Sequence, residues 1–506
     1  MGFSLAWAAT AAKGFPGPRV NDEHSYLLGA ETFAKGRLTN PPHPMARYFE
    51  TFHVLQHPTY TSKYPPANAL VIAAGWAVSG RPIVGVWLSF AFMGVACYWM
   101  FRAWLGNRWG LAVGVANTVW IGLSEAMSYW GTSYWGGALA AGAGALVMGA
   151  LYRIVQRQAK ASAGVALGVG LLLLANTRPF EGLLLALPAA FALLGWWRRT
   201  IRVNRGEVLR VAVPLTVIMA VGFAAMGTYN SAVTGSWRKM PYSAYQEARD
   251  PIPVFLWQQA APMPTATNVS FEKFVTWEDS VYRSSRTPAG RFSYVRRVVR
   301  DYFGHLVPEA ALFPLVLLPW TLRKRWTRFA IGVIVLSCVG MGLTTWFQIH
   351  YGAPMLGLAL VVYGECLRKM ARLRLGTQPV GAALSAAALL FWMLAGAMSF
   401  IQTTPRSSSY WSASGDWPTQ RQLIADTLTR TAPRSLAIVR YGPNHKYASE
   451  WVYNAADIDA APMVWARDFG DAGNAPLLAY FKSRAVWIVD VNGESGPFRV
   501  TRYSPP

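Results

Sequence analysis

The chain has 506 residues, of which 53% are apolar and only 14% charged, and it carries a formal net charge of +23. A soluble protein of this length needs a larger charged surface, so the composition favours a membrane protein. The positive charge does not indicate nucleic-acid binding, because the basic residues fall in short loops between apolar runs.

Ten apolar segments approach the length of about 20 residues that a helix needs to cross a bilayer. They are residues 82–103, 109–125, 134–151, 162–178, 180–197, 208–229, 309–322, 328–347, 352–366 and 379–401. Residues 3–12 are apolar but shorter. This predicts either part of an eleventh span or a short helix packed against its neighbours. We therefore expect a mainly α, polytopic membrane protein with about 10 or 11 spans.

The basic loops set the expected topology, because short loops rich in Lys and Arg stay on the cytoplasmic side. These loops are residues 102–108, 153–160, 198–207, 323–328 and 367–374. The alternate connections then lie outside, and the largest are a first loop at 13–80 and a second at 230–307. Counting 66–79 as a span would invert every later loop, so we interpret it as a helix along the external interface.

Adjacent carboxylates, Asp22 and Glu23, lie near the start of the polar first external loop. One acid beside another suits a general base with a supporting acid, and partial desolvation raises the pKa of such a pair. The alternative is a helix through residue 35 with Asn21 or Asp22 as its N-cap. Spacing alone leaves both readings open.

Three further residues of this loop, Glu50, His53 and His57, follow i, i+3, i+7 spacing. On a helix they would share one face and could hold a divalent metal. Ordinary hydrogen-bonded histidines are the commoner outcome, so these three are only weak metal candidates, and no metal is assigned.

Other polar residues are expected at the external ends of spans. Arg178 would suit a phosphate because of its planar fork, although an ion pair with Glu181 is the simpler alternative. Lys63 with Tyr64 precedes the interfacial helix, and His350 with Tyr351 ends an outward span. A snorkelling lysine and a belt tyrosine are the simpler interpretations there.

The tail at 403–506 is predicted to be a small external α/β domain, leaving 1–402 as the transmembrane domain. Residues 418–431 and 474–483 have helical patterns, and 435–440 and 485–491 have strand patterns.

Taken together, residues 1–400 resemble the GT-C superfamily of membrane glycosyltransferases, notably the family 39 (dolichyl-phosphate-mannose-type) and lipid A aminoarabinose transferases. The resemblance rests on Asp22-Glu23 followed by Tyr26, on Tyr64-Pro65-Pro66 before a short helix, on the span order, and on the external C-terminal domain. Some relatives carry a second acid in the connection equivalent to 126–134, where this chain has only the nearby Glu125.

The resemblance implies inverting transfer of a sugar from a polyprenyl phosphate to an acceptor glycan, lipid or protein. It implies that Asp22 is the base and Glu23 supports it. Lys63, and with it Arg178 and Tyr351, would neutralise the phosphate. It also implies a bacterial inner membrane protein whose site faces the periplasm or cell exterior. The need for a divalent metal stays open, and the sugar and acceptor are not identified.

Two alternatives come from other classes: a transporter or flippase of polyprenyl-linked glycans, and a non-catalytic protein of envelope assembly. A transporter would place charges at mid-bilayer on broken helices, commonly with repeat symmetry. The expected spans are almost free of central charge, which favours the enzyme.

Overall fold

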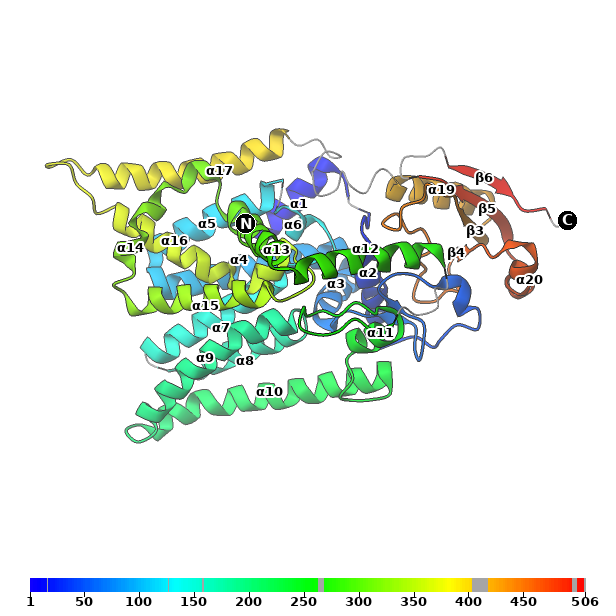
Figure 1. Cartoon of the computed structure of the whole chain (residues 1–506). Helices are drawn as coiled ribbons and strands as arrows, with labels where there is room; N and C mark the ends of the chain where they lie inside the picture. Colours follow the sequence, from blue (N-terminus) through cyan, green and yellow to red (C-terminus); the bar gives the residue numbers. More distant parts are fainter. Residues whose placement is uncertain are drawn as a thin grey trace.

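A computed structural model describes residues 1–504 except 16, 126, 157–158, 263–267, 403–416 and 494–497. Arg157 of the basic loop at 153–160, and the first residues of the predicted tail domain, lie outside that set. Helices dominate the described residues, and a small sheet lies beyond one end of the helical bundle, past α2 and α12 (Figure 1).

The bundle is built from apolar helices of different lengths. They are α1 (Gly2–Lys13), α4 (Ile83–Leu105), α5 (Asn107–Leu123), α7 (Ala138–Gln156), α8 (Ala161–Ala175), α9 (Pro179–Thr200), α10 (Arg205–Thr234), α15 (Arg325–Met341), α16 (Leu356–Met370) and α17 (Val380–Gln402). Among the described residues, α4, α7, α9, α10 and α17 are long and apolar enough to cross a membrane. The prediction of a mainly helical, polytopic fold is confirmed, with several expected spans falling on shorter helices.

Helix α7 forms the centre of the bundle and α10 one edge, where it runs along the outside (Figure 1). Most of α7 is buried, whereas α10 exposes apolar side chains along its length. Small residues let α7 approach its neighbours closely: a Cβ on Gly144 would meet the carbonyl of Pro354 at 2.1 Å. Close contact at small residues is how helices associate where lipid removes the hydrophobic driving force.

The first loop is ordered by three short elements and two helices. Helix α2 (Asn21–Ala34) is followed by η1 (Ala46–Phe49), by the two-residue strands β1 (Val54–Leu55) and β2 (Thr61–Ser62), and then by α3 (Pro66–Ser79). Helix α3 has the range predicted for an interfacial helix. It starts with proline at its first position and ends at Gly80, whose φ of 71° stops the helix. Its place relative to lipid stays a prediction.

The second loop holds three more helices, and the segment after it corrects a prediction. The helices are α11 (Pro241–Arg249), α12 (Val269–Arg286) and α13 (Pro288–Leu306). The expected span 309–322 is not one α-helix: it consists of η2 (Glu309–Ala311), η3 (Phe313–Leu317) and α14 (Leu318–Thr321). Pro314 and Pro319 lack the amide hydrogen that a continuous helix would need.

The C-terminal part contains a four-stranded sheet with two helices. Its elements are α19 (Trp417–Thr431), β3 (Ser435–Tyr441), β4 (Met463–Arg467), α20 (Gly470–Tyr480), β5 (Ala485–Val491) and β6 (Arg499–Arg502). The strand order is β4-β3-β5-β6, with β3 parallel to both neighbours and β6 antiparallel to β5. Strand β3 is buried on both faces, as expected for the middle of a parallel set.

This sheet domain is docked on the first loop by several hydrogen bonds. The Tyr48 hydroxyl donates to the carbonyl of Gly473, and the Tyr60 hydroxyl donates to that of Asn454. Arg467 donates through Nε to the carbonyl of Glu50 at 2.8 Å. The first loop and the C-terminal sheet, which are far apart in the sequence, are therefore packed against each other.

Candidate active site

Asp22 and Glu23 lie in the first turn of α2, and the structure gives their side chains different surroundings. Glu23 is 1% exposed and accepts three backbone hydrogen bonds, from the amides of Arg19 (2.7 Å), Val20 (3.3 Å) and Tyr134 (2.9 Å). Burial raises the pKa of Glu23 to about 7, against the opposing effect of these donors. Glu23, and not Asn21 or Asp22, is therefore the capping side chain of this helix.

Asp22 remains accessible, with its side chain 23% exposed. The Tyr64 hydroxyl donates a short hydrogen bond to Oδ1 of Asp22. Oδ2 of Asp22 lies 3.8 Å from Nε2 of His53. One carboxylate oxygen is thus oriented by a phenol while the other stays reachable, as a general base requires.

His53 is held in place by its backbone. Its φ of 62° is the one positive value among the described residues other than glycine. The Ser25 hydroxyl and the Lys63 amide donate to its carbonyl, and its own amide donates to the hydroxyl of Tyr245. Burial, helped by the charge of Lys63, lowers the pKa of His53 to about 3, so the ring is neutral at physiological pH. An unusual backbone conformation fixed in this way is typical of functional sites.

Lys63 lies near Asp22 and His53, and only 4% of it is exposed. Its Nζ lies 4.6 Å from the ring centre of Tyr245 and 5.0 Å from that of Tyr242. Burial lowers its pKa, whereas the charges of Asp250, Glu278 and Asp22 act in the opposite direction. Lys63 is thus a buried cation in an aromatic cage, where charge interactions are strong.

Two acids beside Lys63 were missed by the sequence analysis. Asp250 follows α11 and Glu278 lies within α12, and their carboxyl groups interact electrostatically with each other. Burial raises the pKa of both, and for Glu278 the neighbouring Asp250 adds to the rise. No spacing pattern connects these residues to the first loop, so only the folded second loop reveals them.

Arg178 brings a second cation to the cluster. Its guanidinium lies over the ring of Tyr351 at 4.3 Å. Tyr26 and Tyr351 each lie within electrostatic range of both Arg178 and Asp22. Tyr26 also stacks on Tyr64 at 4.5 Å. The structure therefore brings the predicted residues Asp22, Lys63, Tyr64, Arg178 and Tyr351 together.

The remaining predicted residues lie at the margin of this cluster. Glu181 is in the first turn of α9 and interacts electrostatically with Arg178. In the part of the chain that the structure describes, the two side chains do not form a direct ion pair. His350 is fully buried. Its Nδ1 lies 3.1 Å from the Tyr129 hydroxyl, and its ring contacts the ring of Trp135. It supports the wall behind Tyr351.

The helix on which Glu50, His53 and His57, the weak metal candidates, would share one face is not formed. Residues 50–57 form turns and the short strand β1, so the i, i+3, i+7 spacing does not align these side chains. Glu50 pairs with Arg249, His53 faces Asp22, and His57 is exposed. Within the described residues, no group of three or more His, Cys, Asp or Glu could hold a metal ion.

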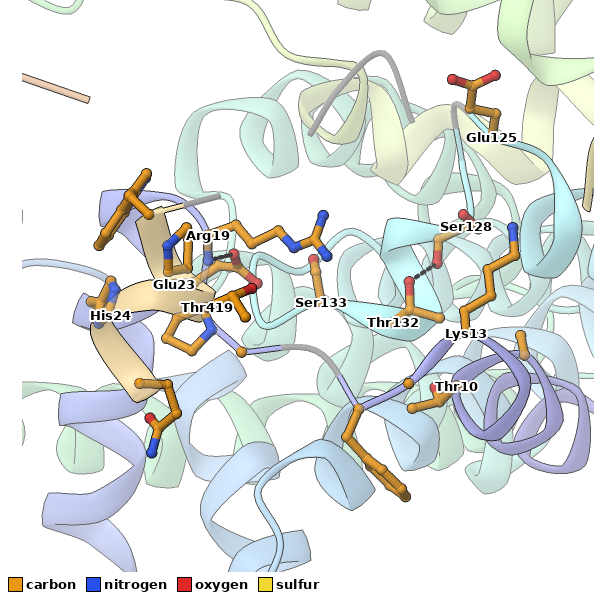
Figure 2. A pocket seen from close by; sticks show the side chains of 18 of the residues that line it. Thr10, Lys13, Arg19, Glu23, His24, Glu125, Ser128, Thr132, Ser133 and Thr419 are labelled. Carbon is orange, nitrogen blue, oxygen red and sulfur yellow. Dashed lines mark hydrogen bonds between the residues drawn. The ribbon is translucent and has the colours of Figure 1, made fainter. Parts of the chain in front are cut away.

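A cavity of about 320 Å³ adjoins the cluster, with Glu23 and His24 on its wall. It is bounded by the end of α1, the start of α2, residues 122–133 and α19 (Figure 2). Figure 2 shows Arg19, Glu23 and Thr419 toward one end of it and Lys13 and Ser128 toward the other. Asp22, one residue away, is not among the residues that line it.

Comparison with known proteins adds evidence on the fold. No family model and no curated protein sequence matches the chain. Among solved structures, it is similar to ArnT from Cupriavidus metallidurans bound to undecaprenyl phosphate, with 12% identity and a TM-score of 0.52 over 97% of this chain and 91% of that one. It is also similar to an oligosaccharyltransferase from Archaeoglobus fulgidus in complex with zinc and sulfate, with 12% identity and a TM-score of 0.51 over 97% and 68%. The chain thus has the fold of GT-C membrane glycosyltransferases.

Proposed function

We propose that this chain is an inverting glycosyltransferase that moves a sugar from a polyprenyl phosphate to a hydroxyl of an envelope glycan, lipid or protein. The observation that carries the proposal is the position of the accessible Asp22 carboxylate beside two cations, the buried Lys63 and the half-buried Arg178. The undecaprenyl phosphate bound by the structural neighbour ArnT supports a lipid phosphate as donor.

Each group has a role in the proposed reaction. Asp22 accepts the proton of the acceptor hydroxyl. At the same time the oxygen of that hydroxyl forms a bond to the anomeric carbon of the sugar. The bond from that carbon to the phosphate oxygen breaks on the opposite face, and its electron pair leaves with the polyprenyl phosphate. Lys63 and Arg178 stabilise the charge that develops on the phosphate, an effect that is strong in a buried site. Tyr64 orients the base through its hydrogen bond to Oδ1.

Glu23 is a positioning residue in this proposal. Its three backbone hydrogen bonds fix the first turn of α2 against the segment at Tyr134. That anchoring sets the direction in which Asp22 points. A misplacement of about 1 Å at a reacting group can cost on the order of 100-fold in rate.

The proposal places the cluster on the periplasmic or external side of a bacterial inner membrane, on the argument from the basic loops. Alkaline phosphatase fused at about residue 75 should be active, and fusions after Arg199 or Arg325 should be inactive. Active fusions at all three positions would refute the orientation without touching the proposed chemistry.

The chemistry is tested with purified protein in lipid nanodiscs and a panel of undecaprenyl-phosphate hexoses and pentoses, by following release of undecaprenyl phosphate. Asp22→Asn keeps an oxygen for the Tyr64 hydroxyl but cannot accept the proton, so we expect the rate to fall about 10²–10⁴-fold. Binding of undecaprenyl phosphate should be retained. The control is Glu247→Gln, which removes an exposed acid that pairs with Lys239. Equal turnover by Asp22→Asn and wild type would overturn the proposal.

A further inference from the structure

A second cavity, of about 430 Å³, lies where the loop between α4 and α5 meets the end of α16. Its polar lining includes Asn107 and three arginines, Arg108, Arg368 and Arg372. In the part of the chain that the structure describes, no carboxylate is among its lining residues. A concave surface with three guanidinium groups and no acid suits an anion, and the planar fork of arginine binds two oxygens of a phosphate at once.

This cavity is remote from the catalytic cluster. Helix α16 connects the two, because it begins shortly after Tyr351 and carries Arg368 in its last turn. The 15 residues of this helix span about 22 Å. In Figure 1 this end of α16 lies near α14, at the end of the bundle away from the sheet domain. The cavity therefore belongs neither to the catalytic cluster nor to the cavity beside Glu23.

A buried acid holds Arg368 in place. Glu365 is 6% exposed, and its two carboxylate oxygens accept hydrogen bonds from Nη2 of Arg368 at 2.7 and 2.8 Å. Lys324 donates to the same carboxylate. One acid thus serves two cations, which leaves a net positive charge beside the cavity. Arg108 and Arg372 are exposed, and within the described residues neither forms an ion pair, so their charges can act on a ligand.

The backbone adds hydrogen-bond donors to the arginines. Helix α5 begins at Asn107 after Gly106, and no side chain of the N-cap residue caps its first turn. The first backbone hydrogen bond at this end is donated by the Gly110 amide to the carbonyl of Gly106, at 2.9 Å. The amides of residues 107–109, which line the cavity, therefore have no acceptor within the helix. The positive end of the helix dipole strengthens the attraction of the arginines for an anion.

Membrane topology alone does not explain this arrangement. Basic loops stay on the cytoplasmic side whether or not their side chains meet. Here Arg108 from one loop and Arg372 from a loop far along the chain line the same cavity. Lys369 and Arg374, from the second of these loops, are exposed but do not line it. Because like charges repel, an anion between Arg108 and Arg372 stabilises their approach.

Apolar side chains adjoin the arginines. Leu105 and Trp109 form part of the lining. Leu111 on α5 and Leu373 after α16 lie close along the chain, and they are 54% and 43% exposed. Tryptophan is enriched where a protein meets lipid headgroups. These surroundings suit a phosphate that is attached to acyl chains, because burying the exposed leucines against those chains adds to the binding.

From these features we infer that the cavity binds the phosphodiester headgroup of an anionic membrane lipid, in the leaflet opposite to the catalytic cluster. The phosphate contacts Arg108, Arg368 and Arg372. The acyl chains lie along Leu111 and Leu373. Basic pockets between membrane helices bind anionic headgroups in this way. The inference does not rest on the proposed glycosyl transfer.

The test uses the full chain, delipidated in detergent, and native mass spectrometry to measure the affinity of the first bound ligand. Dioleoyl phosphatidylglycerol should bind about tenfold tighter than dioleoyl phosphatidylcholine, which has the same phosphodiester but adds a cation. Glycerol 1-phosphate has the phosphate without acyl chains and should bind at least about tenfold more weakly than phosphatidylglycerol. Similar affinities for these two would indicate a soluble phosphate ligand and overturn the assignment to a lipid.

Two double variants separate the cavity from the general positive charge of this face. Arg108→Gln with Arg372→Gln removes two lining charges and should weaken binding of phosphatidylglycerol about tenfold or more. Lys369→Gln with Arg374→Gln removes the same charge from residues that do not line the cavity, and should change the affinity less than about threefold.

All four substituted side chains are exposed, so both double variants should melt like wild type without added lipid. Equal weakening of phosphatidylglycerol binding by the two double variants would show that only the overall charge matters and would overturn the inference. Equal affinity of wild type for phosphatidylglycerol and phosphatidylcholine would overturn it as well.

Discussion

The backbone contact between α3 and α4 gives a sharp prediction, because it connects packing to the position of Tyr64. A Cβ on Gly75 would lie 2.1 Å from the amide nitrogen of Gly85 and 2.5 Å from its Cα. These are backbone atoms, so no side chain can move aside. Gly75→Ala therefore forces the two helices apart by about 1 Å to reach a tolerable contact, at a cost of about 1–3 kcal/mol.

The same shift should lower activity. Helix α3 begins two residues after Tyr64, whose hydroxyl orients Asp22, so a displaced α3 alters the geometry of the base. A displacement of about 1 Å at a catalytic group can cost on the order of 100-fold in rate. We expect Gly75→Ala to lower both the apparent Tm and the rate of undecaprenyl phosphate release.

The control for this prediction is Gly332→Ala in the middle of α15. A Cβ at Gly332 would meet nothing within 4 Å, so the change should leave activity unaltered and raise helix stability by at most about 1 kcal/mol. Thermal unfolding in detergent and the release assay are measured on both variants. If Gly75→Ala unfolds at the same temperature as Gly332→Ala with full turnover, the reasoning from the α3–α4 contact is refuted.

Three further predictions concern ionisable residues. Glu450→Ala leaves the buried Arg467 without its acid, which should cost about 3–5 kcal/mol and speed hydrogen exchange in β3 and β4; unchanged exchange would contradict it. Because the pKa of His53 falls from 6.5 to about 3 on folding, the unfolded chain binds the proton first, and stability should drop as pH decreases from 6.5 toward 3. His53→Asn, which tolerates the positive φ, should flatten that drop, and a Tm profile parallel to that of wild type would refute the assignment. Arg178→Lys keeps the charge but not the fork over Tyr351, so KM for the lipid donor should rise several-fold more than kcat falls; the opposite split would argue against phosphate binding.

The sequence predicted the features that follow from local patterns and from sidedness. The range of α3 follows from its apolar run. The helix starting at Asn21 was one of the two alternatives left open, although Glu23 and not Asn21 or Asp22 caps it. The basic loops predicted that Asp22, Lys63 and Arg178 face one compartment, and the structure places the three residues in one cluster. Periodicity could not decide between catalysis and capping for Asp22 and Glu23, because the answer depends on which side chain turns toward the backbone amides.

Other features depend on contacts between distant segments. Asp250 and Glu278 reach Lys63 only because the second loop folds over the first, and nothing in their spacing encodes that contact. Glu50 likewise pairs with Arg249, about 200 residues later in the chain, a contact that its spacing to His53 and His57 does not encode. At 309–322 the apolar composition predicted one span, but two prolines interrupt the α-helix.

The docking of the sheet domain on the first loop bears on how such proteins can be recombined. Arg467, Tyr48 and Tyr60 join the two through backbone carbonyls, and Glu31 of α2 accepts the amide of Ala456. The sheet domain and the first loop therefore have to be transferred together when a chimeric protein is made. A chimera that receives its sheet domain from a homologous protein needs the first loop from the same parent, because a foreign loop would leave these carbonyl and amide groups unmatched at the junction and α2 without its outer support.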